Sequence, residues 1–458
     1  MTKISKSIFK AYDIRGIYPK EINEKVAFLV GRAFGNFLKI CSKKRKIKIA
    51  IGRDNRISSL NLAKKLKESL LTHDQIEIFD LGLCTTPMMY FSVSHFNLDG
   101  GIEITASHNP PEYNGFKMVK ENSFPIGEKS GLRKIKSFVF KEKEKKFAKK
   151  GKIKRKNIIK DYLDFNLKDF NFKKFSPLKV VIDTANAVPG ILIEKLSKLL
   201  PLKIYHLFPK LDGNFPNHNP DPLIKENLKF LREKVKKEKA DLGVAFDGDG
   251  DRIVFVDEKG EIISGDLILA LISKVILSKN PNQKILYDIR SSNIVRETIL
   301  ENKGIPIVSR IGHSFIKEKM RKENAIFGGE LSGHYYSRDH YFCEAPFFVF
   351  FKILEILSET KKSLSHLIKP FKKYFHSGEI NFRVKNKKEI MEKLKEKYKR
   401  GKLTQIDGIR IDFKDWWFLL RPSNTEPVLR LVIEAKKENI LKEKEKEIKN
   451  LIFSINVA

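Results

Sequence analysis

Cysteine is scarce in this chain of 458 residues, which contains three, at Cys41, Cys84 and Cys343. They lie far apart and form no Cys-x-x-Cys pair. An odd and sparse set argues against a disulfide framework and against a structural zinc site. We therefore expect three ordinary thiols in a reducing compartment.

Long apolar runs are also missing. The longest stretches, Leu267–Leu277 and Pro346–Leu357, are interrupted by lysine or glutamate and fall short of the roughly 18–20 apolar residues of a membrane span. The segment Met1–Lys10 lacks the apolar core of a secretory signal. The sequence therefore predicts a cytoplasmic protein that does not engage a membrane.

Acidic residues are few beside basic ones, 56 against 90, which gives a formal net charge of +34. Such a charge permits a nucleic-acid-binding protein. The basic residues, however, are spread along the chain and often alternate with glutamate, as in Lys141–Lys146, and few aromatics accompany the densest run, Lys149–Lys156. We expect a solvated, lysine-rich surface that attracts anionic substrates, and no nucleic-acid partner.

Short β-rich runs alternate with helical patterns along most of the chain. Strand-like examples are Ile47–Ile51, Ile102–Thr105, Val180–Asp183, Leu242–Phe246 and Ile285–Asp288. This alternation predicts α/β domains with parallel or mixed sheets, whose ligands bind at loops beyond the carboxyl ends of strands.

The length fits four domains of ordinary size. The charged stretch Phe140–Lys160 has low complexity and is typical of a linker or a solvated helix. Further boundaries are expected near Asp257–Gly265 and Lys369–Ser377. The predicted domains are residues 1–150, 151–258, 259–370 and 371–458, the last with a strand, a basic loop, a strand and an amphipathic helix.

Ser107 leaves a strand-like run in a turn that contains Asn109, Pro110 and Pro111. A hydroxyl presented in this way can act as a nucleophile or carry a phosphoryl group, although a serine in a turn is most often only a turn residue. The adjacent His108 suggests a Ser-His dyad. Neighbouring residues rarely place base and nucleophile correctly, and no partnered acid is visible, so a hydrolase triad is disfavoured.

Three aspartates separated by glycines, Asp247, Asp249 and Asp251, follow the run Leu242–Phe246. Carboxylates brought together in this way repel one another unless a cation lies between them, and the glycines let the backbone curl around one point. A calcium loop of the EF-hand type is excluded, because Arg252 replaces its required glycine and a strand-like run follows. Mg²⁺ is the expected ion, since it accepts few carboxylates and completes its shell with phosphate oxygens.

Two later loops suggest a phosphorylated sugar as the ligand. Glu330 and Ser332 stand between glycines and suit two adjacent sugar hydroxyls. A second loop concentrates donors for a phosphate group: Arg421, Ser423, Asn424 and Thr425, with Arg430 following. Each loop alone is also compatible with an ordinary surface turn.

Scattered polar residues at strand ends and turns add to this interpretation. They are Tyr12 and Arg15 near the N-terminus, Lys117 after the serine loop, and His313 in a Gly-His-Ser turn. Each alone is more often a surface or packing residue. Together they favour an anionic substrate.

With these loops in this order, the chain resembles the α-D-phosphohexomutase family, and within it the bacterial phosphomannomutase/phosphoglucomutase branch, from about Phe9 to about Arg430. The segments Phe9–Gly16 and Asp212–His218 are similar to that family as well. The resemblance implies an α/β fold of four domains around a central cleft, three of them related mixed-sheet α/β domains and the last a smaller α+β domain.

The resemblance also implies roles for individual residues. Ser107 would be the phosphoserine, and with Asp247, Asp249 and Asp251 it would hold Mg²⁺. The expected catalytic residues are Ser107, His108, Lys117, Arg252 and His313, and the general base is left open among His108, Lys117 and His313. The expected substrate-binding residues are Tyr12, Arg15, Glu330, Ser332, His334, Arg421, Ser423, Asn424, Thr425 and Arg430. Arg290 departs from the family pattern, because some members have lysine there.

The expected reaction interconverts a hexose 1-phosphate and a hexose 6-phosphate, of mannose or glucose or both, through a hexose 1,6-bisphosphate. Leu331 favours this branch over phosphoglucosamine mutases, which more often carry a polar residue at that position. A metal-dependent serine phosphatase is the less favoured alternative, because it needs neither the Glu330 loop nor the Arg421 loop. The expected partner is a small phosphosugar, and the chain is expected to be a monomer or a homodimer.

Overall fold

The computed structural model describes residues 4–42, 44, 46–141, 151–422 and 428–457. The chain divides into two compact units. Unit 1 comprises Met1–Ser264 and Ser332–Ser365, and unit 2 comprises Gly265–Leu331 and His366–Ala458. Among the described helices, none has the length and apolar character needed to cross a membrane.

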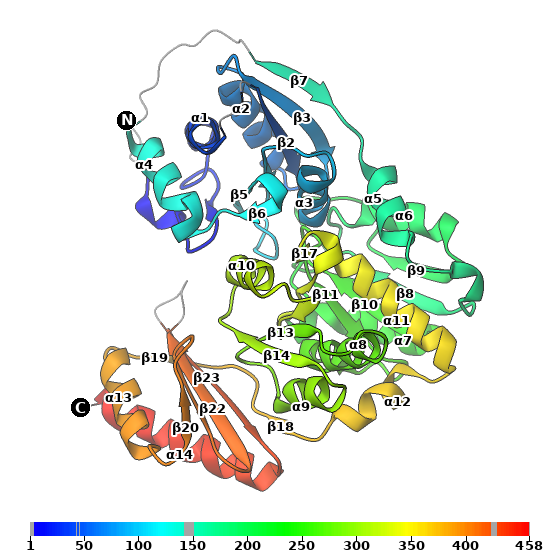
Figure 1. The fold of residues 1–458 in the computed structure, drawn as a ribbon, viewed down its shortest axis with the longest axis vertical. Coiled ribbons are helices and arrows are strands. Elements are labelled where there is room, and N and C mark those ends of the chain that lie inside the picture. The colour runs from blue at the N-terminus through cyan, green and yellow to red at the C-terminus, as the bar shows by residue number, and fades with distance from the viewer. Residues whose placement is uncertain (1–3, 43, 45, 142–150, 423–427, 458) are drawn as a thin grey trace. The chain divides into compact units, whose positions relative to one another are not determined.

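The first sheet of unit 1 is mixed (Figure 1). Its strands, in spatial order, are β1 (Ile14–Ile17), β5 (Tyr113–Lys120), β4 (Gly100–Ile104), β2 (Ile47–Arg53), β3 (Ile76–Leu83) and β7 (Lys152–Arg155), with β6 (Phe124–Pro125) beside β5. Strands β4, β2, β3 and β7 are parallel, and β5 is antiparallel to both β1 and β4. The carboxyl ends of β2 and β4 therefore open at the same edge of the sheet, where polar loops follow both strands.

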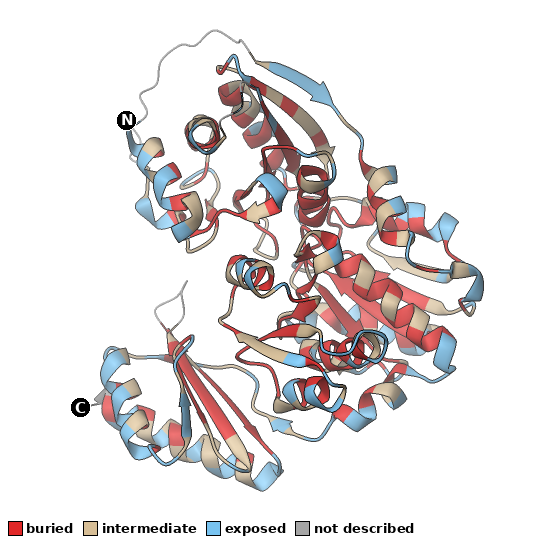
Figure 2. Ribbon diagram, viewed as in Figure 1, coloured by how far each residue is buried: buried red, intermediate tan, exposed pale blue. Residues whose placement is uncertain are grey.

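Four helices accompany this sheet: α1 (Glu24–Cys41), α2 (Ser59–Leu70), α3 (Thr86–His95) and α4 (Arg133–Lys141). Apolar side chains of α1, α2 and α4 and of strands β1 to β5 form one core, which Figure 2 shows as buried strands flanked by half-exposed helices. Burial of each large aliphatic or aromatic side chain contributes about 1.5–3 kcal/mol. This core fixes the ends of the strands that carry the polar loops.

The second sheet of unit 1 has the order β12 (Ile262–Ile263), β11 (Ile253–Val256), β10 (Leu242–Phe246), β8 (Lys179–Asp183) and β9 (Lys203–Leu207). Every residue of β10 is buried, as expected for a central strand that is covered on both faces. The helices of this segment are α5 (Ile159–Leu167), α6 (Gly190–Leu199) and α7 (Lys229–Glu238).

A hairpin and a long helix complete unit 1. The hairpin consists of β16 (Tyr335–Ser337) and β17 (Cys343–Glu344), and α11 (Pro346–Thr360) follows it. Phe347 of α11 stacks on Phe246 of β10, with ring centroids 5.2 Å apart. This contact ties α11 to the strand that leads into the acidic loop.

Unit 2 contains a parallel three-stranded arrangement of β14 (Ile305–Ser309), β13 (Lys284–Asp288) and β15 (Phe327–Gly329). Its helices are α8 (Gly265–Lys279), α9 (Asn293–Glu301) and α10 (His313–Glu323), and α12 (Leu364–Ile368) spans the junction of the two units. Strand-helix alternation again places polar loops after β13 and β15.

The C-terminal part of unit 2 is an antiparallel sheet with two helices. The strand order is β18 (Phe375–His376), β23 (Val428–Ala435), β22 (Trp416–Pro422), β21 (Ile409–Asp412) and β20 (Lys402–Thr404), with β19 (Ile380–Arg383) also paired to β23. The two helices are α13 (Lys387–Lys397) and α14 (Glu438–Val457), whose apolar residues share one core with the strands.

The prediction for Phe140–Lys160 is wrong in part. Instead of a continuous linker or helix, the segment contains β7 as an edge strand of the first sheet, and α5 begins at Ile159. All four residues of β7 are exposed, so no apolar alternation marks the strand in the sequence. Residues 142–150 of this segment lie outside the described part of the chain.

Candidate active site

Ser107 lies in the turn that follows β4, a strand whose five residues are all buried. The serine is buried as well, and its backbone N–H donates to Thr105 Oγ1 at 2.8 Å. Its φ of 53° falls in the left-handed region, which residues other than glycine rarely adopt. The surrounding contacts must therefore maintain this backbone conformation, and they fix the position of the hydroxyl.

The buried guanidinium of Arg56 supplies most of those contacts. Its Nη2 donates to the carbonyl oxygens of Ser107 at 2.8 Å and Asn109 at 2.6 Å, and its Nη1 donates to that of Pro110 at 2.6 Å. The carboxylate of Asp54 lies 3.1 Å from Nε and balances the charge. One side chain thus orients three carbonyls of the serine turn.

The acidic loop follows β10 and approaches the serine turn closely. Its three carboxylates are fully buried and belong to Asp247, Asp249 and Asp251. A Cβ atom at Gly248 would lie 2.3 Å from the carbonyl oxygen of Ser107, and Gly250 has a φ of 69°. The two glycines are therefore required, one for the close approach of the loops and one for the turn itself.

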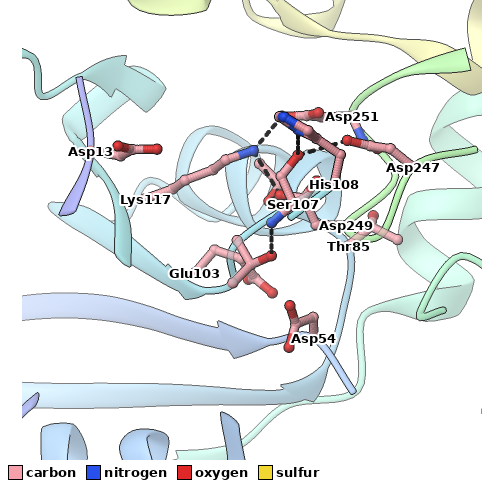
Figure 3. A network of polar contacts seen from close by, with 12 residues as sticks. Asp13, Asp54, Thr85, Glu103, Ser107, His108, Lys117, Asp247, Asp249 and Asp251 are labelled. Carbon is pink, nitrogen blue, oxygen red and sulfur yellow. Dashed lines mark hydrogen bonds and ion pairs between the residues drawn. The ribbon is translucent and has the colours of Figure 1, made fainter. Parts of the chain in front are cut away.

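Lys117 on β5 pairs with two carboxylates of the acidic loop (Figure 3). Its buried ammonium lies 2.7 Å from Asp249 Oδ2 and 2.5 Å from Asp251 Oδ2. Burial alone would lower the pKa of Lys117, but the aspartates overcome this effect and raise it. Burial would likewise raise the pKa of Asp251, yet the lysine charge holds that pKa well below its usual range.

The hydroxyl of Ser107 has two polar neighbours. Its Oγ donates to Asp247 Oδ2 at 2.7 Å and lies 3.3 Å from His108 Nδ1. Burial, together with the like charges of the other two aspartates, raises the pKa of Asp247 well above its usual value. The adjacent side chains of Ser107 and His108 therefore lie within hydrogen-bond distance of each other, although adjacent residues rarely place a base and a nucleophile correctly.

The acidic loop fits a divalent cation. One oxygen from each aspartate lies within 4.8 Å of the others, in a group made of Asp247, Asp249 and Asp251. Among the described residues, the buried Asp249 Oδ1 has no hydrogen-bond partner, whereas its Oδ2 accepts from Thr86 Oγ1 at 2.5 Å and from Lys117. Carboxylate oxygens of this kind are the ligands that Mg²⁺ prefers.

The N-terminal segment contributes Arg15 to the serine turn. Its Nη1 donates to Asn109 Oδ1 at 2.5 Å and its Nη2 to Asp13 Oδ2 at 2.6 Å. Tyr12, also predicted here, is half-buried three residues before it. The structure therefore brings Arg15 to the same turn as Ser107, as the substrate-binding prediction requires.

Arg252, Ser332 and His334 form a polar chain beside the acidic loop. His334 Nε2 lies 3.4 Å from Arg252 Nε and 3.2 Å from Asp251 Oδ1, and its Nδ1 lies 3.1 Å from Ser332 Oγ. The backbone N–H of Arg252 donates to Asp247 Oδ1 at 3.1 Å. The predicted sugar-binding residue His334 thus contacts the predicted metal loop within unit 1, and Ser332 contacts His334.

The remaining predicted residues belong to unit 2. Glu330 is buried after β15, 3.7 Å from Arg290 Nη2, which also pairs with Asp288 at 2.8 Å. His313 is buried at the start of α10. The residue that departs from the family pattern therefore lies beside the predicted sugar-binding carboxylate.

The predicted phosphate-binding arginines lie on neighbouring strands. Arg421 on β22 stands directly opposite Arg430 on β23. Glu379 contacts both guanidinium groups, at 3.2 Å and 2.7 Å. The other predicted members of this loop, Ser423, Asn424 and Thr425, lie outside the described residues.

Direct contacts to the predicted groups are also made by Arg56, Thr86 and Glu379, for which the sequence had indicated no individual role. Thr86 follows Thr85, whose side chain caps α3 by accepting from Met88 N at 3.3 Å. A Thr-Thr-Pro segment signals a helix start, but nothing local in it indicates a contact with Asp249. These contacts span large sequence separations, so short motifs do not reveal them.

Comparison with known families matches the chain in four parts. Residues 6–146, 160–260 and 264–374 match α/β/α domains I, II and III of phosphoglucomutase/phosphomannomutase, and residues 379–451 match the C-terminal domain. A phosphomannomutase of Methanocaldococcus jannaschii is 44% identical, and the match covers 98% of both chains. One of Vibrio cholerae is 39% identical over 98% of this chain and 99% of the relative.

A solved structure agrees with these relatives. The crystal structure of a phosphoglucomutase/phosphomannomutase family protein from Burkholderia thailandensis superimposes with a TM-score of 0.90. The two chains are 32% identical, and the match covers 99% of this chain and 98% of the other.

The fold and these relatives define the class of protein as an isomerase of carbohydrate metabolism that acts as an intramolecular phosphotransferase. The chain belongs to the phosphoglucomutase/phosphomannomutase family and is a phosphohexose mutase. The predicted family is confirmed, and so are the three α/β domains and the C-terminal domain with its antiparallel sheet. The placement of the four domains around a cleft, their boundaries and the site roles stay predictions.

Proposed function

We propose that this mutase interconverts the 1-phosphate and 6-phosphate of mannose, glucose or both through a phosphorylated Ser107. The observation that carries the proposal is the position of the Ser107 hydroxyl, 2.7 Å from Asp247 and beside the loop of three aspartates. The curated relatives at 44% and 39% identity are named phosphomannomutases, which supports mannose as one sugar.

Each half of the proposed reaction moves one phosphoryl group. The bond between phosphorus and Ser107 Oγ breaks, a bond to the free 1- or 6-oxygen of the sugar phosphate forms, and a base transfers the proton of that hydroxyl to the released Ser107 Oγ. The product is a hexose 1,6-bisphosphate, which turns over and returns its other phosphoryl group to Ser107. Positioning and charge neutralisation supply most of the acceleration in such transfers.

The described residues suit separate tasks in this scheme. Asp247, Asp249 and Asp251 would hold Mg²⁺ with an oxygen of the phosphorylated serine, and the ion would neutralise charge on the phosphoryl group. Among the three candidate bases, His108 lies within 3.3 Å of Ser107 Oγ. Lys117 is instead engaged with two carboxylates, which favours His108 as the proton acceptor.

Each part of the substrate is assigned its own residues. Arg15 and Arg252 would contact the reacting phosphate, since both approach the loops that surround Ser107. Glu330, Ser332 and His334 would bind the sugar hydroxyls, and Arg421 and Arg430 the phosphate that does not react. The remaining residues assigned to substrate are Tyr12, Ser423, Asn424 and Thr425, and His313 keeps its assignment as a catalytic residue.

The partner in this proposal is a small phosphosugar, and the chain works in the cytoplasm as a monomer or homodimer. None of the three cysteines forms a disulfide, and two of them, Cys84 and Cys343, are buried, as suits a reducing compartment.

The decisive assay supplies the wild-type chain with Mg²⁺, a trace of hexose 1,6-bisphosphate and one of three substrates. Mannose 1-phosphate and glucose 1-phosphate should isomerise to their 6-phosphates, and glucosamine 6-phosphate should react more slowly. Preferred turnover of glucosamine 6-phosphate would identify the hexosamine alternative. Steady release of inorganic phosphate without isomerisation would instead support a serine phosphatase.

A further inference from the structure

Two arginines on neighbouring strands of unit 2 place like charges close together. Arg421 and Arg430 are direct partners in the antiparallel register of β22 and β23. The side chain of Arg421 is 5% exposed and that of Arg430 is 22% exposed. Like charges directly opposite each other destabilise a sheet, so this pair needs an anion.

Glu379 provides that anion from within the chain. Its Oε2 lies 3.2 Å from Arg421 Nη2 and its Oε1 lies 2.7 Å from Arg430 Nη1, so each carboxylate oxygen pairs with a different guanidinium. The residue immediately precedes β19, which pairs with β23 and sets Asn381 opposite Arg430. The bridge therefore depends on the register of three strands.

The arginine pair retains capacity for a further acceptor. Arg421 Nε is buried and has no hydrogen-bond partner among the described residues. Burial lowers the pKa of Arg421, and the charge of Glu379 opposes this change. The nearby charges of Arg290 and Asp407 act on the same pKa in opposite directions. A carboxylate supplies two oxygens, whereas a phosphate group supplies more and can engage both guanidinium forks.

We propose that Glu379 is an internal competitor for the substrate phosphate that binds Arg421 and Arg430. This inference rests on the proposed function, which assigns both arginines to the phosphate that does not react. A phosphate that engages Arg421 Nη2 and Arg430 Nη1 as well must displace the carboxylate that now pairs with them, and the displaced charge then repels the ligand. The competition lowers the affinity of the two arginines for phosphate. This suits an enzyme whose bisphosphate intermediate must leave this site with one phosphate and bind it again with the other.

A simpler role for Glu379 predicts the opposite result. If the carboxylate only holds the two arginines in position for phosphate, its removal loosens them and weakens phosphate binding. If it competes, its removal strengthens phosphate binding. The sign of the change in affinity therefore separates the two roles.

The test measures the dissociation constant of inorganic phosphate by titration calorimetry, in full-length chains that carry Ser107→Ala so that no transfer occurs. In that background, Glu379→Gln should bind phosphate about threefold to tenfold more tightly. Glu396→Gln, which neutralises an exposed glutamate of α13 in the same unit, should bind as the parent does. Equal or weaker binding by Glu379→Gln would overturn the inference.

A second pair of variants assigns the gain to the arginines. Arg430→Met should weaken phosphate binding, and Glu379→Gln should give no gain when combined with it. A gain that persists in the double variant would contradict the inference, since another site would be responsible. Unchanged phosphate binding by both Arg430→Met and Arg421→Met would instead overturn the proposed phosphate site itself. Thermal unfolding of each variant confirms that the chains compared are folded.

Discussion

Arg56 Nη2 donates to the backbone carbonyl of Ser107 at 2.8 Å, and the same guanidinium reaches three other carbonyls of that turn, those of Asn109, Pro110 and Tyr113. Ser107 has a left-handed backbone that a serine does not favour. The guanidinium therefore holds the nucleophile's backbone in place without touching its hydroxyl. This makes Arg56 a positioning residue for the transfer step.

The substitution Arg56→Lys should lower kcat about 100-fold. A lysine ammonium cannot donate to four carbonyls in fixed directions, and a small misplacement of a reacting group lowers the rate by about this factor. The KM for hexose 1-phosphate should change little, since Arg56 is buried and its guanidinium donates to backbone carbonyls. The lysine still balances Asp54, which protects the fold. Steady-state kinetics separate kcat from KM.

The control for this prediction is Arg155→Lys, at an exposed position on β7, which should leave both constants as they are. A rise in KM with unchanged kcat in Arg56→Lys would show that the residue acts in binding and would contradict the positioning role.

Ser107→Ala should lose nearly all turnover and still bind the sugar phosphate, because only the phosphoryl carrier is removed. Activity is followed by conversion of glucose 1-phosphate, and binding by calorimetry. Substantial remaining turnover would mean that another residue carries the phosphoryl group.

Ser107→Thr keeps the hydroxyl and still should be a poor enzyme. A β-branched residue at a φ of 53° is strained by about 1–3 kcal/mol, so the turn should shift and carry the hydroxyl away from Asp247. We expect a large loss of kcat in the same assay. Wild-type activity in Ser107→Thr would show that the left-handed backbone is not needed for transfer.

Lys117→Met should make the stability of the chain depend on metal. The substitution leaves Asp249 and Asp251 buried without their nearest cation, and breaking a buried pair in this way costs about 3–5 kcal/mol. Added Mg²⁺ should restore much of this loss, because it would supply the missing charge. Thermal unfolding with EDTA and with Mg²⁺ measures both effects.

The wild-type chain is the reference for that experiment and should respond less to Mg²⁺, because its lysine already neutralises the same carboxylates. A Lys117→Met chain with the wild-type melting temperature in EDTA would contradict the account of the acidic loop.

Acid should destabilise the chain through His340. This imidazole is buried among aromatic rings, with Phe165 at 5.0 Å and Phe348 at 5.2 Å between ring centroids. Burial, with a smaller effect of Lys168, lowers its pKa from 6.5 to about 3. Between these values the unfolded chain binds more protons, so the free energy of unfolding falls with falling pH, by up to about 1.4 kcal/mol per pH unit.

The substitution His340→Phe removes the imidazole that binds this proton in the unfolded chain. The decline in stability between pH 6.5 and pH 4 should therefore be less steep. His366→Asn, at an exposed histidine, should leave the decline as it is. Unfolding at a series of pH values gives both slopes. An unchanged slope in His340→Phe would show that His340 does not contribute to acid sensitivity.

Much of the fold follows from the sequence because its signals are local. The run Leu242–Phe246 forms β10 with the predicted bounds, and Ile253–Val256 forms β11, which supports the rejection of a calcium loop. Strand β7 escaped prediction because its residues are exposed and mostly basic, and only pairing with β3 makes it a strand.

The sequence predicts those parts of the candidate site whose residues lie together in one loop. The aspartates of the acidic loop and Ser107 stand in short motifs, and glycine spacing shows why they can approach. No local motif indicates what Arg56 or Glu379 contacts, because their partners are carbonyls or guanidinium groups many residues away. Their importance depends on tertiary contacts that no local pattern specifies.

The central claim is that Ser107 carries the phosphoryl group, and direct detection of that group tests it. The chain is treated with Mg²⁺ and glucose 1,6-bisphosphate, digested, and examined by tandem mass spectrometry, with Ser107→Ala as the control. The account predicts one added phosphoryl group, located on Ser107 and lost again when glucose 6-phosphate is supplied. A phosphoryl group on another residue, or active turnover with none on Ser107, would contradict it.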